Sequence, residues 1–212
     1  MVRQIQNYGE KKLRAKKTET AIRKEQIVGA ALDLIGSKGV QSLSIARIAA
    51  QVGIVPSAIY SHFKGKEDIL DEVLALIKNR FLENVAQIRQ ETPKARDRLK
   101  LLLKKQTFML NENRAIPYVV FADGMYTGNP ERKAKVAETM MTFLGMVQKI
   151  IEEGRKDGSI REDMISATAA IMFIGMIMPV AIISNLSEGL FDINEHLKNV
   201  WPAFDRCLST RN

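Results

Sequence analysis

The sequence contains few of the residue types that build disulfides, metal sites and active sites. Its one cysteine, Cys207, excludes an intramolecular disulfide and a cysteine-rich metal site, and it fits a reducing compartment such as the cytoplasm. Its two histidines, His62 and His196, have no partners at metal-ligand spacing, so we expect neither a metal nor a cofactor. Nucleophile elbows, phosphate loops and dinucleotide fingerprints are also missing. This argues against an enzyme, although the scattered carboxylates leave acid–base chemistry open.

The net charge of +8 is concentrated in the first third of the sequence. Residues 1–66 carry 12 Lys and Arg against 4 Asp and Glu, whereas residues 67–212 carry 20 of each sign. Such an asymmetry indicates a surface for a polyanion such as nucleic acid. Residues 1–17 have no apolar stretch, so we expect no secretory signal there and interpret them as a flexible basic arm. A purely solubilising role for this arm is the alternative.

One long segment has no charge at all. Residues 164–187 are apolar over a length that could cross a bilayer as a helix. However, Pro179 interrupts the segment, and neither an aromatic belt nor a positive cluster flanks it. Because a helix that is apolar all round can also be buried between protein layers, we expect no membrane association. A membrane-attached helical protein is the less favoured alternative.

Apolar residues recur at spacings of three and four along most of the chain, which predicts an all-α fold. Ser44 is a plausible N-cap, Gly39 a left-handed helix end, and Pro56 a first-turn residue. We predict a basic module over residues 18–66 and a larger helical body over residues 67–212. The expected helices lie near 18–35, 44–52, 56–63, 66–88, 94–113, 116–125, 130–157, 163–187 and 194–209.

The basic module has the form of a helix-turn-helix, because two short helices are joined through Gly53. In such a motif the second helix enters the major groove with its first residues at the base edges. The expected anchors in the core are Ile48, Ile54, Ile59 and Phe63. The expected reading residues are Val55, Pro56 and Ser57, and those beside phosphates are Tyr60, His62, Lys64 and Lys66. Packing of the Tyr60 ring on its own domain is the alternative for that residue.

Residues 23–70 resemble the DNA-binding domain of the TetR family of bacterial transcriptional regulators. The resemblance lies in "AALDLIGSKG", "IARIAAQVGI", "AIYSHF" and "KGKEDIL". It implies a homodimer on a near-palindromic operator, with phosphate contacts from Ser44, Tyr60, His62 and Lys66. It also places Arg47, Pro56 and Ser57 at or near base edges, although Arg47 could be only a solvated residue. Val55 stands where the family usually has a Ser or Thr cap, and is instead available to a thymine methyl group.

Family analogy further implies that the body, residues 67–212, binds an effector and forms the dimer interface. We predict a repressor that a small hydrophobic effector releases; the alternative is a DNA-binding dimer without an effector. A plain core role is the alternative for each pocket residue. The predicted pocket residues are Phe108, Met109, Tyr118, Phe121, Met125, Met140, Phe143, Phe173 and Met176. The predicted interface residues are Ile171, Ile174, Ile182, Trp201 and Phe204.

Overall fold

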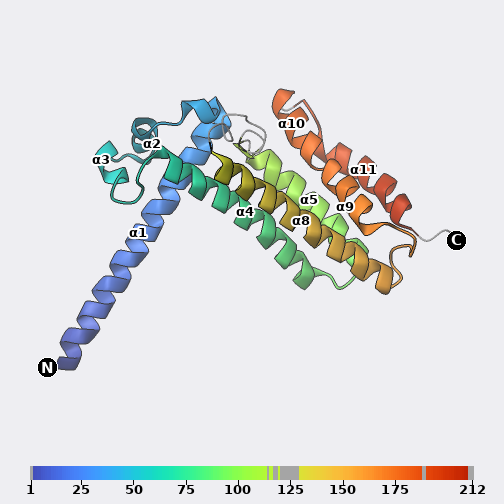
Figure 1. Ribbon diagram of the computed structural model, residues 1–212, viewed down its shortest axis with the longest axis horizontal. Coiled ribbons are helices and arrows are strands. Elements are labelled where there is room, and N and C mark those ends of the chain that lie inside the picture. Colours follow the sequence, from blue (N-terminus) through green and yellow to red (C-terminus); the bar gives the residue numbers. More distant parts are fainter. Residues whose placement is uncertain (1, 114, 117–118, 120–128, 188–189, 210–212) are drawn as a thin grey trace. The chain divides into compact units, whose positions relative to one another are not determined.

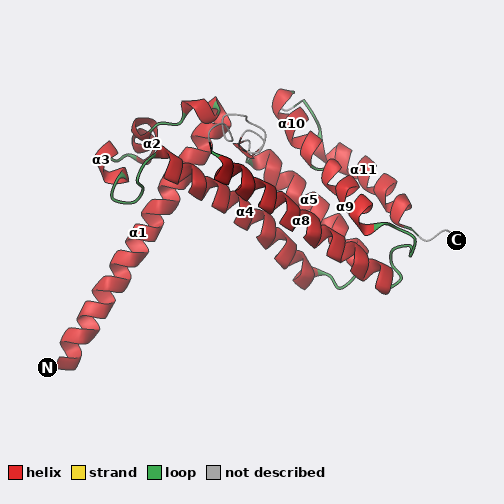
Figure 2. Cartoon of the chain, in the orientation of Figure 1, coloured by secondary structure: helices red, strands yellow, loops and turns green. Residues whose placement is uncertain are grey.

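The computed structural model describes residues 2–113, 115–116, 119, 129–187 and 190–209, with side chains from residue 19 onward except at residue 185. Every regular element in these ranges is a helix, which confirms the predicted all-α class (Figures 1 and 2). Most of the predicted helix at 116–125 lies outside the described residues, and so do the pocket residues Tyr118, Phe121 and Met125.

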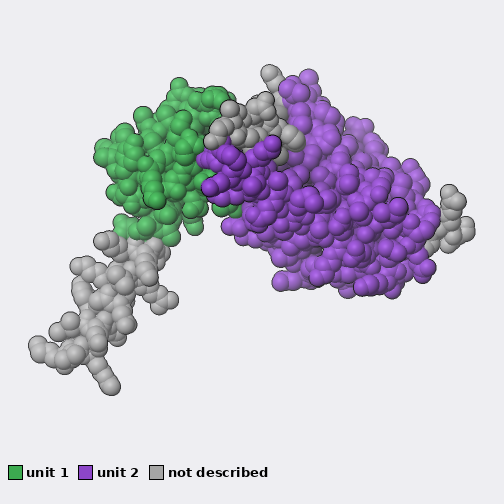
Figure 3. Space-filling model, in the orientation of Figure 1, with its two compact units in different colours: residues 1–75 green, residues 76–212 purple. Residues whose placement is uncertain are grey.

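The chain divides into two compact units, Met1–Ala75 and Leu76–Asn212 (Figure 3). We call them the amino-terminal unit and the body. The amino-terminal unit contains α1 (Val2–Lys38), the 3-10 turn η1 (Val40–Ser42), α2 (Ile45–Val52), α3 (Pro56–Ile59) and the start of α4 (Lys66–Glu91). The predicted boundary at residue 66 coincides with the first residue of α4.

Helix α1 begins at Val2, far ahead of the predicted start at Thr18. Residues 10–24, "EKKLRAKKTETAIRK", explain this difference, because Lys, Arg, Glu and Ala are strong helix formers and no Gly or Pro interrupts them. The charge of this segment suggested an arm, whereas its helix propensity decides its structure.

A small apolar core holds the helices of the amino-terminal unit together. Ile27, Ala31 and Ile35 lie on one face of α1 and are fully buried. Ile48 of α2 and Ile59 of α3 are also fully buried. Because α1 packs on α2 and α2 packs on α3, this core positions the short third helix.

The body contains the rest of α4 together with α5 (Ala95–Glu112), α8 (Pro130–Lys156), α9 (Ser166–Gly175), α10 (Met178–Leu186) and α11 (Ile193–Leu208). Helix α5 packs against α8, α10 and α11, and α8 packs against α9. The single helix predicted over residues 163–187 is in fact two helices, α9 and α10. Pro179 lies in the first turn of α10, where its missing N–H costs no helical hydrogen bond.

Aromatic contacts fill the body core. Phe81 of α4 meets Phe143 of α8 edge to face, with ring centroids 5.4 Å apart. Phe204 of α11 lies 6.0 Å from Phe173 of α9 and 6.3 Å from Trp201. The first and last of these helices are thus tied to the middle of the bundle by large apolar side chains.

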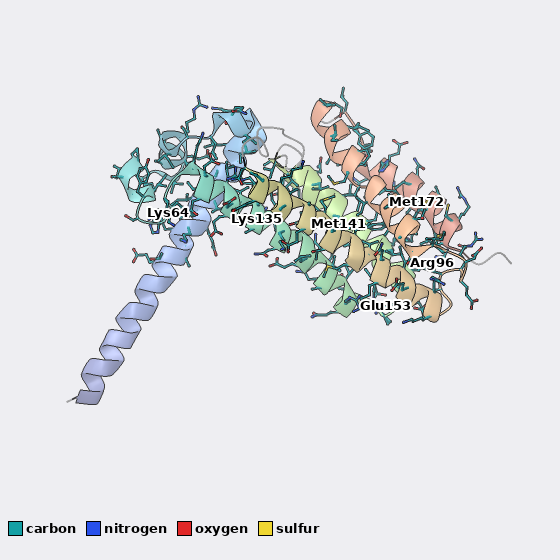
Figure 4. The ribbon with its side chains drawn as sticks, viewed as in Figure 1. Lys64, Arg96, Lys135, Met141, Glu153 and Met172 are labelled. Carbon is teal, nitrogen blue, oxygen red and sulfur yellow. The ribbon has the colours of Figure 1, made fainter. Side chains whose placement is uncertain are left out.

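Ion pairs join the helix ends near the α4–α5 turn. Glu153 of α8 accepts hydrogen bonds from Arg89 of α4, at 3.0 Å, and from Arg98 of α5, at 2.7 Å. Arg96 donates to Asp205 of α11 through two nitrogens. Figure 4 shows Arg96 and Glu153 at the same end of the body. These contacts fix the carboxyl end of α4 to α8.

The segment Ser166–Ser184 is apolar and long enough to cross a membrane by length and composition alone, with a mean hydropathy of 2.2. The break at Met176 and Ile177 divides it between α9 and α10, and 33% of it is buried in the body. A single segment of this kind is weak evidence of a span, and nothing else supports the membrane-attached alternative.

Candidate nucleic-acid interface and body grooves

The turn between α2 and α3 depends on a left-handed glycine. Gly53 ends α2 with φ 75° and ψ 35°, and its N–H donates to the carbonyls of Ala49 and Ala50. The N–H of Ile54 then donates to the Ala49 carbonyl at 3.0 Å. An L-residue rarely adopts this conformation, so glycine permits the sharp change of direction. The predicted role of Gly53 is confirmed.

Helix α3 presents its first residues to solvent. Pro56 occupies its first turn, as predicted, and Val55 precedes it with extended backbone and without a side-chain cap. Val55 is 64% exposed, and Pro56 and Ser57 are also exposed. Ile59 is the buried residue of this helix. One apolar anchor thus holds a short helix whose amino-terminal side chains are free to contact a partner.

The segment after α3 adds polar and basic groups. Tyr60 is 59% exposed, so its ring is not packed away in its own unit. Lys64 and Lys66 are exposed, and the backbone N–H of Lys64 donates to the Asp68 carboxylate at 3.1 Å. This bond fixes the loop to the first turn of α4, and Figure 4 marks Lys64 on it. Both lysines are therefore carried on a constrained loop.

His62 and Phe63 form the inner side of this loop. Phe63 is buried, and the ammonium of Lys24 from α1 lies 5.2 Å from the centre of its ring, within the range of a cation–π contact. The Nδ1 atom of His62 is buried and has no hydrogen-bond partner among the described residues. The sequence analysis did not identify Lys24, because nothing in local spacing indicates which α1 residue meets Phe63.

Helix α2 begins at the predicted cap. The hydroxyl of Ser44 accepts a hydrogen bond from the Arg47 N–H at 3.3 Å. The Arg47 guanidinium donates to the Ser42 carbonyl at 3.0 Å, on the exposed surface. To contact a base, this side chain must leave the Ser42 carbonyl, which is a small cost because the bond is open to water.

Chemically, this surface is suited to a duplex. Lys64 and Lys66 offer positive charge, Ser57 and Tyr60 offer hydroxyls, and Val55 offers an apolar tip beside them. Cations and hydroxyls bind phosphate oxygens, while small side chains at a helix start reach base edges. The described residues include no group of three or more His, Cys, Asp or Glu that could hold a metal ion. The contacts of the individual residues with DNA stay predictions.

Among the described residues of the body, two open grooves run along α5. One, of about 540 Å³, lies between α5 and α11. The other, of about 510 Å³, lies between α4 and α5. The first is lined by Asp97, Lys100, Leu101, Leu103, Lys104, Phe108, Asn194, Leu197, Lys198, Trp201 and Pro202. The second is lined by Arg80, Glu83, Asn84, Gln87, Leu101, Lys104, Lys105, Phe108, Met109 and Glu112.

The predicted pocket residues fall into two groups. Phe108 lines both grooves and Met109 lines the second. Phe143 and Phe173 are buried in the aromatic core, and Met140 and Met176 are half-buried. The lysines of the grooves were not predicted. The pattern "LKLLLKKQ" over residues 99–106 could have indicated them, since it sets basic residues beside an apolar stripe.

The predicted interface residues also divide. Ile171 is 62% exposed and Ile182 is exposed as well, while Ile174 is half-buried. Trp201 and Phe204 are buried against their own chain, where Phe204 meets Phe173. The part of the predicted set that a partner could reach is therefore on α9 and α10.

Comparison with known proteins identifies the class. Residues 27–73 match the family described as bacterial regulatory proteins, tetR family. Residues 62–204, more than half of the chain, match the YsiA-like protein, C-terminal region. The chain belongs to the TetR family, as the resemblance of residues 23–70 predicted. It is a DNA-binding transcriptional regulator.

Among individual proteins, the chain is 28% identical over 152 residues to the fatty acid metabolism regulator protein of Bacillus subtilis, covering 72% of this chain and 78% of that protein. Its fold matches the transcriptional regulator FadR from Bacillus subtilis in complex with stearoyl-CoA, with a TM-score of 0.74, 24% identity, and 87% and 98% of the two chains covered. It also matches AibR in complex with isovaleryl coenzyme A and operator DNA, with a TM-score of 0.68, 17% identity, and 85% and 97% covered. At these identities the structural matches show a shared fold.

Proposed function

We propose that the protein is a homodimeric repressor that binds a near-palindromic operator and leaves it when the body binds an acyl-CoA. The observation that carries this proposal is the start of α3, whose exposed Val55, Pro56 and Ser57 follow a left-handed turn while Ile59 holds the helix in place. This is the arrangement by which a helix enters the major groove. Such a protein acts in the cytoplasm and needs no catalytic activity.

An exposed apolar stripe on α9 and α10 supports the dimer. Ile171 and Met172 on α9 and Ile182 and Ile183 on α10 are all exposed, and Leu186 continues the series. On α10, Leu186 follows Ile182 by four residues and Ile183 by three, so it neighbours both on the surface of that helix. A continuous apolar surface of this kind indicates an interface, and two copies joined there would present two reading helices to the two half-sites.

The grooves and the relatives support the effector class. A hydrophobic ligand fits the apolar side chains that α5 contributes to both grooves, namely Leu101 and Phe108. The relatives that share this fold include one in complex with stearoyl-CoA and one in complex with isovaleryl coenzyme A. An acyl-CoA has an apolar chain for such a surface and a charged nucleotide that stays near solvent.

Helix α4 is the proposed connection between effector and DNA. It runs unbroken from Lys66, a predicted phosphate contact, to Glu91, and Arg89 near its other end is paired with Glu153. A ligand that changes the packing of α4 would move its first turn, and with it the spacing of the two reading helices. Because half-sites lie about 34–36 Å apart, a small movement would lower operator affinity without unfolding the protein.

Operator binding in the presence of ligand tests this coupling. Fluorescence anisotropy of a labelled operator would be measured with the protein alone, with stearoyl-CoA, and with coenzyme A as the matched ligand that lacks the acyl chain. We expect stearoyl-CoA to weaken operator binding at least about tenfold, a coupling of roughly 1.4 kcal/mol, and coenzyme A to have little effect. Equal operator affinity with and without every acyl-CoA that demonstrably binds would refute the coupling and favour a body that serves only to dimerise.

A further inference from the structure

We infer that the groove between α5 and α11 holds the phosphate-bearing end of the acyl-CoA. In this assignment Lys100, Lys104 and Lys198 contact the phosphates, and the side chain of Trp201 forms part of the apolar floor. The inference rests on the proposed function for the class of ligand. It adds a location and three residues that neither the sequence analysis nor the family resemblance identified.

The three lysines of this groove bring positive charge from two helices to one place, and none of them is neutralised by a described carboxylate. Elsewhere Lys78 pairs with Glu138 at 2.9 Å, and Lys105 pairs with Glu91. Within the part of the chain that the structure describes, Lys100, Lys104 and Lys198 form no ion pair or hydrogen bond, and all three are exposed.

Two of these lysines also repel each other. Lys100 and Lys104 are four residues apart on α5, so they lie on the same side of that helix. Like charges at this spacing destabilise a helix. Lys198 adds a third charge from α11, and Asp97 is the one carboxylate among the residues that line the groove. A bound anion would relieve this repulsion.

Most of the other side chains that line the groove are apolar. Leu101, Leu103 and Phe108 come from α5, and Leu197, Trp201 and Pro202 come from α11. The volume of about 540 Å³ is within the usual range for small-molecule sites. A groove lined by both cations and apolar side chains matches a ligand that carries phosphates at one end and a hydrocarbon chain at the other.

The neighbouring groove between α4 and α5 is less suited to phosphates. Its Arg80 donates to the Asn113 side chain at 2.6 Å, and its Lys105 is paired with Glu91. It also includes Glu83 and Glu112. Lys104 lines this groove too, but two carboxylates oppose its cations, whereas Asp97 alone opposes the three lysines of the α5–α11 groove. The balance of charge therefore assigns the phosphates to the α5–α11 groove.

A ligand in the α5–α11 groove would join two helices with different roles. Helix α5 contacts α8 and α10, and α11 packs through Phe204 on α9. Since α9 and α10 carry the proposed dimer surface, occupation of the groove would bias the packing beneath that surface. The assignment thus gives the ligand a route to the dimer in addition to α4.

Trp201 is the chain's only tryptophan, so its fluorescence reports directly on this groove. The full-length protein would be titrated with stearoyl-CoA, following tryptophan emission and, in parallel, heat by calorimetry. We expect a saturable change in emission with the same Kd as the heat. The variant Lys100→Gln/Lys104→Gln/Lys198→Gln should bind at least about tenfold more weakly and with a shallower salt dependence.

The matched control is Lys133→Gln/Lys149→Gln/Lys156→Gln, which removes three exposed lysines of α8 and keeps the net charge of the two variants equal. It should bind stearoyl-CoA with the wild-type Kd. Operator affinity without ligand should be unchanged in both variants, which shows that each is folded. Stearate, which lacks the phosphates, should bind the wild-type protein far more weakly than stearoyl-CoA.

The outcomes separate this inference from the proposed function. The groove assignment is overturned if calorimetry gives the triple variant of Lys100, Lys104 and Lys198 the wild-type Kd for stearoyl-CoA. It is also overturned if stearoyl-CoA binds without changing Trp201 emission; in both cases acyl-CoA binding itself stands. Stearate that binds as tightly as stearoyl-CoA would overturn the role of the phosphates. Absence of heat with stearoyl-CoA and with isovaleryl coenzyme A would instead contradict the proposed effector class.

Discussion

At single positions, backbone conformation matters as much as side-chain chemistry. Gly53 has φ 75°, and an added Cβ there would meet nothing within 4 Å, so any cost of Gly53→Ala comes from the backbone. We expect a loss of about 1–2 kcal/mol of stability in denaturant unfolding. Gly29→Ala is the control, since Gly29 lies inside α1 with equal space around it, and should gain roughly 0.5–1 kcal/mol. Equal effects at both positions would contradict the left-handed turn.

Single residues also separate phosphate contacts from base contacts. Lys66→Ala should weaken binding to all duplexes alike and flatten the log–log dependence of affinity on salt by about 0.9. Ser57→Ala should leave that slope nearly unchanged and alter the preferred sequence, because a hydroxyl at the start of α3 carries no charge. Salt titrations on the selected operator and on a scrambled duplex measure both effects. An unchanged slope in Lys66→Ala means that this lysine contacts no phosphate.

Among the described glycines, Gly154 of α8 has the closest neighbours around its missing Cβ. A Cβ at Gly154 would lie 2.6 Å from Cδ1 of Ile160 and 3.1 Å from Cβ of Ala95, and both neighbours are fully buried. Gly154→Ala should therefore cost about 1–3 kcal/mol of stability. Gly145→Ala, on the same helix with open space, should be stabilising. Thermal unfolding measures the stability of both variants. Equal stability of Gly154→Ala and Gly145→Ala would contradict the close packing around Gly154.

Local rules predicted elements and their ends well. The Ser44 cap, the Gly53 turn and the Pro56 start each follow from the chemistry of one or two residues, and all are present. Pro179 marked an interruption of the apolar run, but the same rules kept residues 163–187 as one helix and did not place the break at Met176 and Ile177. They also missed Lys24 against Phe63, a contact between residues far apart in sequence.

The body was harder to predict for the same physical reason. Its grooves arise where α5 meets α4 and α11, so their lining combines residues from distant segments. Trp201 was assigned to the dimer interface because it is large and apolar, yet its burial against α5 and α11 neighbours places it in a groove. Periodicity identifies which residues are apolar, and only packing decides what covers them.

For the whole molecule, the exposed stripe on α9 and α10 should determine the oligomeric state. Ile171→Glu/Ile182→Glu places two charges in the proposed interface, where desolvation would oppose association, so we expect monomers and a loss of operator affinity of 100-fold or more, on the order of 3 kcal/mol. Met141→Glu, at an apolar position of α8 about as exposed as Ile171, should stay dimeric. Sedimentation velocity at micromolar concentration distinguishes the two. A dimeric double variant would place the interface elsewhere.

The central claim is that two copies of α3 read the two halves of one operator, and selection from random DNA tests it most directly. The purified wild-type protein would be incubated with a randomised duplex library, and the bound fragments sequenced over several rounds. The account predicts enrichment of an inverted repeat whose half-site centres lie about 34–36 Å, or a multiple of that distance, apart along the duplex. Enrichment of a single half-site without symmetry, or no enrichment over the starting library, would contradict it.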